Sequence, residues 1–394
     1  GNPTQRLQLV GVLGTRSASG VSALLAGVLQ AAGRQFGILS SCGCMDSREM
    51  MSGRSTRQSI DGMVSWLQRC ERLGCTHAIL EITPSMLASG VTAGCLFDVL
   101  CVGDRIGRPA GVPEADHLRN ILRLFRQVRT DSGHGFAVFN ADAPAAIRVL
   151  EQVAAPSLTV RVNRDADVTA RVLEQNSSEQ TFFLQAGDDV IPVRTRRLGH
   201  RVVSDALVAT ATGLGWNLPL HMIVRGLESI DAIPGHSERI VCGQEFGVCV
   251  ESRRSTAMLR ETLSTLRDTS PRRILCVIDA ETPLPQARRI QWIETLDGFA
   301  DQIVLTAARW KPFTSGRTDT SLTRTLEAIR RAFPDPSRVR VVARRDRAIA
   351  TVLREAGRGD MVLLAGGRRT TDPETSLPTD DAELARKWLR SPRP

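Results

Sequence analysis

The sequence predicts an α/β protein in which strands and helices alternate through two successive domains. Short apolar runs bounded by turn residues recur along the chain, and stretches with apolar residues at helical spacing follow many of them. A Pro234-Gly235 break separates two such series. We therefore expect mostly parallel sheets, with one domain over residues 1–232 and a smaller, doubly wound Rossmann-like domain over residues 233–394.

The first domain opens on an apolar run at residues 7–12, followed by a helical pattern over residues 21–29. The next predicted elements are a helix at 59–72, strands at 78–80 and 97–102, a helix at 118–128 and a strand at 135–140. From residue 155 to 196 the pattern becomes rich in strands, which predicts an antiparallel appendage on the sheet.

The second domain repeats the alternation on a smaller scale. Its predicted strands lie at 273–278, 302–305, 339–342 and 360–365, and a short terminal helix lies at 380–389. This order and spacing are typical of a doubly wound sheet.

The amino-acid composition limits the kinds of partner that the protein is expected to bind. The 394 residues carry a net charge of +9, but the basic side chains are spread along the chain, and only Lys311 and Lys387 are lysines. Because aromatic residues make up 4% and tyrosine is absent, stacking surfaces for nucleic-acid bases are not expected. No apolar run reaches the roughly 18 to 20 residues of a membrane helix, and the nine cysteines lack zinc spacing, so we expect a cytoplasmic protein with reduced thiols.

The loop at residues 11–20 resembles a phosphate-binding loop, because it joins a strand to a helix. In such loops a lysine reaches the β- and γ-phosphates, a second glycine lets the backbone close around them, and a hydroxyl holds Mg²⁺. Here Ala18 stands at the lysine position and Ser17 at the glycine position. Ser19 is the one residue of the three that could still meet a metal.

Taken in order, the motifs resemble the Mur ligases, especially the type that adds the third amino acid to UDP-N-acetylmuramoyl-dipeptide. The matching segments are Gly11–Thr15, Glu81–Leu87, Phe97–Val99, Phe139–Pro144, Leu198–Leu207, Pro234–Arg239, Glu251–Leu259 and Gly359–Gly367. The resemblance implies a central domain that binds ATP and a C-terminal Rossmann-like domain that brings the incoming amino acid. No segment of the sequence resembles the family's UDP-sugar-binding domain.

The departures from the family pattern fall on its chemistry. The carbamylated lysine of the family aligns near Ile121, and its Asp-Asn-Pro-Arg signature aligns with residues 307–310, where it is not recognisable. The Lys-Gly-His-Glu loop has become Gly367–Thr370. Ligation through an acyl phosphate needs cations at the transferring phosphoryl group. We therefore expect ligation to be lost, no resident cofactor, and Mg-ATP only if an atypical ligase activity persists.

Several residues remain as candidate sites under this resemblance. The remnant of the phosphate loop comprises Gly14, Thr15, Arg16 and Ser19, and Arg16 could contact a phosphate in place of the lysine. Ser19 and Glu81 are the candidate metal ligands, and Glu81 and His200 the catalytic remnants. Each has a structural alternative: a capped carboxylate at a strand end for Glu81, a capping role at a helix start for His200, and a solvated loop side chain for Arg16.

Two arginines, Arg239 and Arg368, are candidate ligand-binding residues for an acidic group. His77 and His221 lie on apolar stretches, which places them in the core.

Three classes of function follow. The first is a degenerate Mur-ligase-like binding or scaffolding module, whose partner is an acidic cell-wall precursor, held by arginines in a basic interdomain cleft, or another protein. The second is an atypical ATP-dependent ligase acting with a separate sugar-binding subunit. The third, driven by charge alone, is a nucleic-acid binder.

Overall fold

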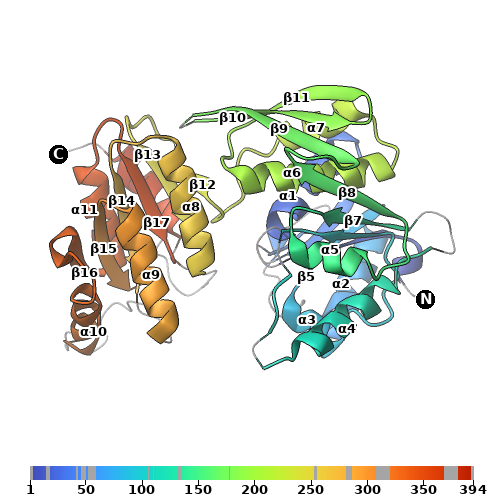
Figure 1. Ribbon diagram of the computed structural model, residues 1–394, viewed down its shortest axis with the longest axis horizontal. Coiled ribbons are helices and arrows are strands. Elements are labelled where there is room, and N and C mark those ends of the chain that lie inside the picture. The colour runs from blue at the N-terminus through green and yellow to red at the C-terminus, as the bar shows by residue number, and fades with distance from the viewer. Residues whose placement is uncertain are drawn as a thin grey trace. The chain divides into compact units, whose positions relative to one another are not determined.

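In the computed structural model, two compact units follow one another along the chain (Figure 1). The first unit comprises Gly1–Gln175 and Glu179–Asp231, and the second comprises Asn176–Ser178 and Ala232–Pro394. The structure describes residues 3–14, 18–40, 43–45, 50–51, 59–104, 106–109, 111–130, 135–176, 178–252, 255–280, 286–307, 320–367 and 380–391. The predicted α/β fold with large, mostly parallel sheets is confirmed.

The sheet of the first unit has the strand order β11-β10-β9-β8-β7-β6-β1-β5-β2-β3-β4. Its strands are β1 (Gln8–Leu13), β2 (Phe36–Ser40), β3 (Gly43–Met45), β4 (Met50–Met51), β5 (His77–Ile82), β6 (Val99–Val102), β7 (Phe136–Asn140), β8 (Ser157–Val162), β9 (Val168–Gln175), β10 (Gln180–Ala186) and β11 (Asp189–Thr195). Strands β2, β5, β1, β6, β7, β8 and β9 run parallel.

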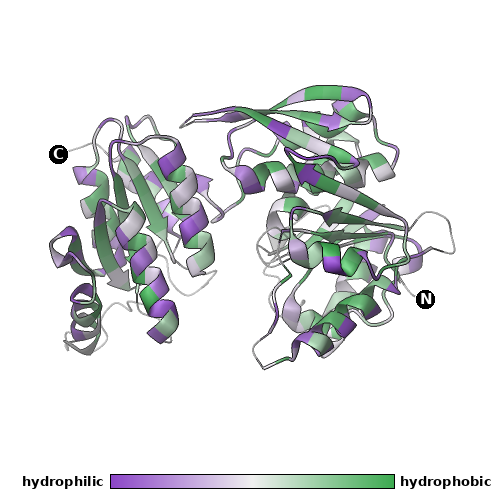
Figure 2. Cartoon of the chain, in the orientation of Figure 1, coloured by the Kyte–Doolittle hydropathy of each residue, from purple (hydrophilic) through white to green (hydrophobic). Residues whose placement is uncertain are grey.

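Helices cover both faces of this sheet because side chains of β1 alternate between the faces. Leu9 and Leu13 belong to one buried cluster, with α2 (Ile60–Arg72), α3 (Pro84–Ser89), α4 (Glu114–Phe125) and α5 (Pro144–Leu150). Val10 and Val12 belong to the other, with α1 (Ala18–Ala31), α6 (His200–Gly215) and α7 (Leu220–Glu228). Figure 2 shows the hydrophobic strands between these helices.

The strand-rich region differs from the prediction of an antiparallel appendage. Strand β8 pairs parallel with β7 and with β9, so the antiparallel part is limited to β9, β10 and β11. A short link at residues 163–167, with Asn163 at a φ of 60°, returns the chain so that Val168 lies opposite Val160. Asp167 fixes this link, because its carboxylate accepts hydrogen bonds from the backbone N–H and the hydroxyl of Thr159, both at 2.7 Å.

The sheet of the second unit has the order β12-β13-β17-β14-β15-β16. Its strands are β12 (Glu238–Arg239), β13 (Gly247–Glu251), β14 (Ile274–Asp279), β15 (Gln302–Ala307), β16 (Val339–Arg344) and β17 (Met361–Ala365). Helices α8 (Thr256–Asp268), α9 (Gln286–Phe299) and α10 (Thr320–Arg330) pack on one face, and α11 (Arg345–Glu355) and α12 (Asp381–Arg390) on the other. Strand β17 lies between β13 and β14, which makes the unit doubly wound as predicted.

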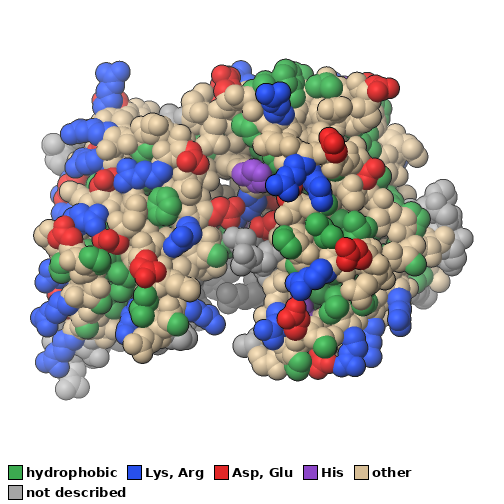
Figure 3. Space-filling view, in the orientation of Figure 1, with side chains coloured by type: hydrophobic (Ala, Val, Ile, Leu, Met, Phe, Trp, Pro, Cys, Tyr) green, Lys and Arg blue, Asp and Glu red, His purple; other side chains and the backbone are tan. Residues whose placement is uncertain are grey.

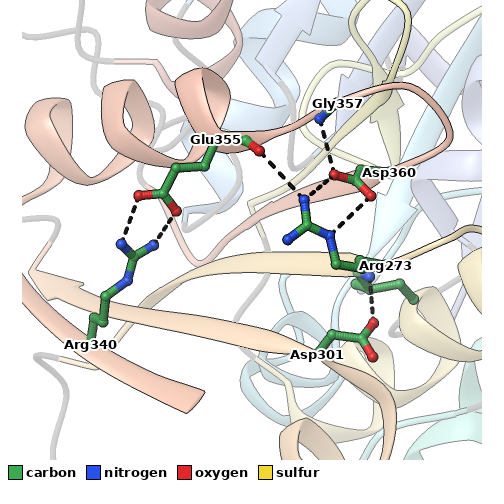
Figure 4. A network of polar contacts seen from close by, with 7 residues as sticks. Arg273, Asp301, Arg340, Glu355, Gly357 and Asp360 are labelled. Carbon is green, nitrogen blue, oxygen red and sulfur yellow. Dashed lines mark hydrogen bonds and ion pairs between the residues drawn. The ribbon is translucent and has the colours of Figure 1, made fainter. Parts of the chain in front are cut away.

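A network of ion pairs links the elements at the amino edge of this sheet, where β14 and β17 begin (Figure 4). Arg273 donates to both oxygens of Asp360, at 3.2 and 2.5 Å, and the Asp360 side chain is fully buried. Arg340 forms a bidentate pair with Glu355, whose backbone carbonyl also faces Arg273 at 3.5 Å. The hydrogen bonds from Arg273 hold the pKa of Asp360 below its ordinary value.

The eight cysteines that the structure describes are free thiols, and all but the partly buried Cys242 are buried. Burial raises the pKa of Cys95 to about 11 and that of Cys101 to about 12, so both stay protonated at neutral pH. The expectation of buried thiols is confirmed for the seven buried cysteines. Within the described ranges, no helix has the length and apolar character needed to cross a membrane.

Candidate functional site

The candidate site of the first unit lies at the carboxyl edge of its sheet, which is the edge where the parallel strands end. Ligands of open α/β sheets bind at this edge, and helix N-termini there attract anions. Strand β1 ends at Leu13 and Gly14 follows it, while Thr15, Arg16 and Ser17 lie outside the described residues. Helix α1 then begins at Ala18.

Ser19 and Glu81 come together at this edge. Ser19 lies in the first turn of α1, and Glu81 lies near the end of β5, which pairs with β1. The Ser19 hydroxyl donates to Glu81 Oε2 at 3.1 Å, and the two residues are 2% and 5% exposed. The two candidate metal ligands of the sequence analysis are therefore joined directly by a hydrogen bond.

The positions that align with the family's lysines are buried among apolar side chains. Ala18 is 1% exposed and lies in the core beneath α1. Ile121 is 3% exposed and belongs to the core on the other face of the sheet. A lysine at either position would have to bring its ammonium group out of an apolar environment, which is costly without a partner.

Asp205 adds a carboxylate that the sequence reasoning missed. It lies on α6 and is 2% exposed, and its Oδ2 would be only 2.0 Å from a Cβ atom at Gly20. The carboxylate therefore packs directly against the first turn of α1, and only glycine leaves room for it. The available signal was local: within the matched segment 198–207, Asp205 stands where the family pattern has its last asparagine.

A buried cation accompanies Asp205. Arg197 precedes α6 and is 8% exposed. Burial lowers its pKa to about 10, against the opposing effect of the Asp205 carboxylate and together with the repulsion of Arg201. Arg197 therefore remains protonated at neutral pH and partly offsets the charge of Asp205.

The matched segment 139–144 has a structural role in this edge. Asn140 ends β7 and donates from Nδ2 to the Ser204 hydroxyl at 2.7 Å, which ties the strand to α6. Its side-chain oxygen accepts the Asp142 N–H at 3.0 Å, and the Asp142 carboxylate accepts the Val162 N–H at 2.7 Å. These hydrogen bonds hold neighbouring strand ends together.

The predictions made for the three histidines His77, His200 and His221 can be compared with their positions in the structure. His200 is the first residue of α6 and is exposed, but the N-cap is Gly199 and makes no side-chain capping bond, so the capping role for His200 is wrong. His221 lies on α7 and is exposed, which contradicts its placement in the core. That α7 is amphipathic explains the error, because one apolar face is compatible with a solvated histidine on the other. His77 is 5% exposed, as predicted.

The donor set can be compared with what Mg-ATP requires. The described residues of this edge include the Ser19 hydroxyl, the carboxylates of Glu81 and Asp205, and the cation of Arg197. No group of three or more His, Cys, Asp or Glu side chains in the described ranges has metal-binding geometry. Phosphoryl transfer depends on cations around the transferring group, and in this set of described residues the protein's own cation is Arg197.

The carboxyl edge of the second unit is held by a buried ion pair. Arg345 begins α11 and donates to both oxygens of Asp381 on α12, at 2.7 and 2.5 Å, and also to the Ala365 carbonyl at 3.0 Å. Arg345 and Asp381 are 7% and 3% exposed. Burial alone would lower the pKa of Arg345, but the Asp381 charge and hydrogen bonds hold it above its ordinary value.

Gly367 makes room for this ion pair, since a Cβ atom there would lie 1.9 Å from Asp381 Oδ2. The pair lies beside the ends of β14 and β17, where the chain order in the sheet reverses and where ligands of doubly wound sheets bind. Neither Arg345 nor Asp381 was singled out from the sequence, because 36 residues separate them.

The two arginines predicted to bind an acidic ligand are placed as follows. Arg239 lies on β12 opposite Cys249, is partly buried, and has its pKa lowered by burial. Its Nη1 is buried and has no hydrogen-bond partner among the described residues. Arg368 lies outside the described residues, so its role stays a prediction.

Comparison with known proteins identifies the class of this fold. Residues 255–368 match the family described as Mur ligase, glutamate ligase domain. The chain is 24% identical over 399 aligned residues to a UDP-N-acetylmuramoyl-L-alanyl-D-glutamate–2,6-diaminopimelate ligase of Bacillus licheniformis, covering 99% of this chain and 80% of the relative. It is 28% identical to the ligase of the same name from Solibacter usitatus, covering 99% of this chain and 78% of the relative.

Solved structures agree on the fold. A UDP-N-acetylmuramoyl-L-alanyl-D-glutamate–2,6-diaminopimelate ligase superimposes with a TM-score of 0.70 at 19% identity, covering 97% of this chain and 78% of the other. A folylpolyglutamate synthase from Mycobacterium tuberculosis gives 0.69 at 17% identity, covering 99% and 93%. The chain is thus similar to the Mur ligases in sequence and in fold, as its motifs indicated.

Proposed function

We propose that this protein is a Mur-ligase-like binding or scaffolding module that has lost ATP-dependent ligation. Its proposed partner is an acidic precursor of cell-wall synthesis or another protein, and its proposed location is the cytoplasm. The relatives named above are ligases that act on a UDP-N-acetylmuramoyl-peptide, which supports the choice of an acidic cell-wall precursor.

The observation that carries the proposal is the buried Asp205 carboxylate against the first turn of α1. A phosphate group bound at the N-terminus of α1 would lie at the positive end of the helix dipole, where the Asp205 carboxylate already lies. The phosphate would therefore meet the negative charge of Asp205 instead of a lysine. The absence of lysine at Ala18 and Ile121 supports the same proposal, because neither position supplies the ammonium group that the family pattern has there.

Calorimetry with Mg-ATP tests this proposal. We expect a dissociation constant weaker than about 100 µM, which corresponds to a binding free energy weaker than about −5.5 kcal/mol. The double substitution Ser17→Gly and Ala18→Lys should restore part of the binding but no ligation. Ser17→Gly alone is the matched control, because it supplies the loop glycine without the cation. Binding by the unaltered protein tighter than about 100 µM would contradict the proposal.

An atypical ligase is the second candidate, favoured by the surviving Ser19–Glu81 pair. It predicts phosphate release that requires ATP, a UDP-N-acetylmuramoyl-peptide and an amino acid together, and that Glu81→Ala abolishes. Such an activity would replace the proposal of a binding module.

Nucleic-acid binding has weaker support. Figure 3 shows Lys and Arg side chains dispersed over the visible face of both units and interspersed with Asp and Glu. A nucleic-acid binder would show a steep loss of affinity with rising salt, and a binding module of the proposed kind would not.

A further inference from the structure

A second pocket of the first unit lies at the amino edge of its sheet, where the parallel strands begin, opposite the edge that holds Ser19 and Glu81. Its volume is about 660 Å³, within the range of small-molecule sites. The strand starts Gln8, His77, Asp98 and Phe136 line its floor, and Arg34 and Trp216 line its sides. All of its lining residues belong to the first unit.

The hydrogen bonds of Thr76 define the state of the His77 ring. The Thr76 hydroxyl has one hydrogen, which it donates to the Gln35 carbonyl at 3.1 Å, a group that can only accept. The hydroxyl must therefore accept the second hydrogen bond, 2.7 Å long, from His77 Nδ1–H. The proton lies on Nδ1, and Nε2 carries a lone pair.

The ring stays neutral at physiological pH. Burial, together with the smaller effect of the Arg34 charge, lowers the pKa of His77 to about 4. The indole of Trp216 contacts the ring edge to face, with centroids 4.9 Å apart. His77 therefore offers an acceptor in a fixed orientation and cannot readily become a donor.

The charged groups around this pocket leave one cation uncompensated among the described residues. Asp98 pairs with Arg129 at 3.3 Å and accepts the Leu9 N–H at 2.7 Å. Arg6, on the rim, pairs with Glu71 at 2.9 Å. Arg34 makes no ion pair with any described residue, and its charge acts on the same space as His77.

We propose that this pocket binds a phosphomonoester of a small organic group, with the phosphate on Arg34, one phosphate O–H donated to His77 Nε2, and the organic part against Trp216. A neutral histidine that can only accept selects a protonated oxyanion over one without hydrogen, because an acceptor facing an acceptor leaves a buried group unpaired. The volume exceeds the needs of a bare phosphate, which favours an ester.

Phenyl phosphate and phenyl sulfate test this selectivity at pH 6, where the phosphate monoester retains an O–H in a large fraction of molecules and the sulfate ester has none. Calorimetry on the full chain should give at least tenfold tighter binding for phenyl phosphate, a difference of about 1.4 kcal/mol. Inorganic phosphate, which lacks the organic group, should bind more weakly than phenyl phosphate. Nitrogen NMR of His77 should show a change at Nε2 with phenyl phosphate only.

Two substitutions test whether phenyl phosphate binds in this pocket. Arg34→Gln should weaken phenyl phosphate binding about tenfold, by about 1.4 kcal/mol. Arg123→Gln, the same charge change on the exposed surface of α4, should leave it unaltered. Equal affinities for the two phenyl esters, an unchanged His77 signal, or full binding by Arg34→Gln would each overturn the proposal. Phenyl phosphate that binds at the Ser19 edge would leave the NMR signal of His77 unchanged. Such binding would therefore count against this proposal and would bear only on the proposed function.

Discussion

The carboxyl edges of the two units differ in how their buried charged side chains are arranged. In the second unit, the buried Arg345 and Asp381 neutralise each other through two hydrogen bonds. In the first unit, Glu81 and Asp205 lie around the first turn of α1, with Arg197 as the buried cation that interacts with Asp205. Both edges are filled by the protein's own polar groups, in the place where this class of fold binds ligands.

This difference between the two edges indicates two roles for buried charged side chains. A charge-balanced pair such as Arg345–Asp381 joins two helices, and its removal leaves one uncompensated charge in the interior. We propose that the acidic groups of the first unit instead limit which ligands the edge accepts, since a carboxylate at a helix N-terminus occupies the position that favours anions.

The largest expected effect comes from breaking the balanced pair. Asp381→Asn should lower the free energy of unfolding of the second unit by about 3 to 5 kcal/mol, because it leaves Arg345 buried without its counter-charge. Chemical denaturation of the variant and the parent measures this loss.

Two further variants control this experiment. The double variant Arg345→Met and Asp381→Leu should recover much of the loss, because it buries no charge. Arg148→Ala, which removes an exposed pair with Glu114, should change stability by less than about 1 kcal/mol. A loss equally small for Asp381→Asn would show that the buried pair is not what holds α12.

Acid should affect the first unit before the second. The folded pKa of His77, about 4, lies below its ordinary value of 6.5, so the unfolded chain binds the proton first and stability falls as pH drops from 6.5 to 4. The loss amounts to about 3 kcal/mol at 1.36 kcal/mol per unit of pKa. Asp360 also has a lowered pKa, but a carboxyl group begins to lose its contribution only below about pH 4.

Hydrogen exchange resolved by peptide distinguishes the two responses. Peptides of the first unit should lose protection between pH 6.5 and 4.5, while peptides around Arg273 and Asp360 keep it. His77→Gln should reduce the pH dependence in the first unit, and part of it should remain because burial also lowers the pKa of His117. Earlier loss of protection in the second unit would contradict the assignment.

The smallest expected effect concerns the charge of Asp205. Asp205→Asn should strengthen the binding of pyrophosphate at the first turn of α1 about tenfold, by about 1.4 kcal/mol, because it removes the carboxylate that faces the helix start. Asp116→Asn, the same charge change on an exposed side chain of α4, is the control. Equal gains for both variants would assign the effect to net charge.

Much of the fold was accessible from the sequence. The alternating apolar runs predicted the parallel strands, and Ser59 at the start of the predicted helix 59–72 proved to be its N-cap. The collinear motifs indicated the similarity to the Mur ligases, and they singled out Ser19 and Glu81 as candidate metal ligands, although the hydrogen bond between the two was not predicted. The absence of lysine before Lys311 needed no structure at all.

What only the tertiary structure decided are contacts between residues far apart in the chain. Asp205 reaches Gly20 across 185 positions, and Arg345 reaches Asp381, because helices from different parts of the sequence converge on one sheet edge. The parallel pairing of β8 with β9 depended on a five-residue link whose geometry Asp167 fixes. Local periodicity determines which face of an element is apolar, but the order of strands determines which polar side chains meet, and that order arises only when the whole sheet forms.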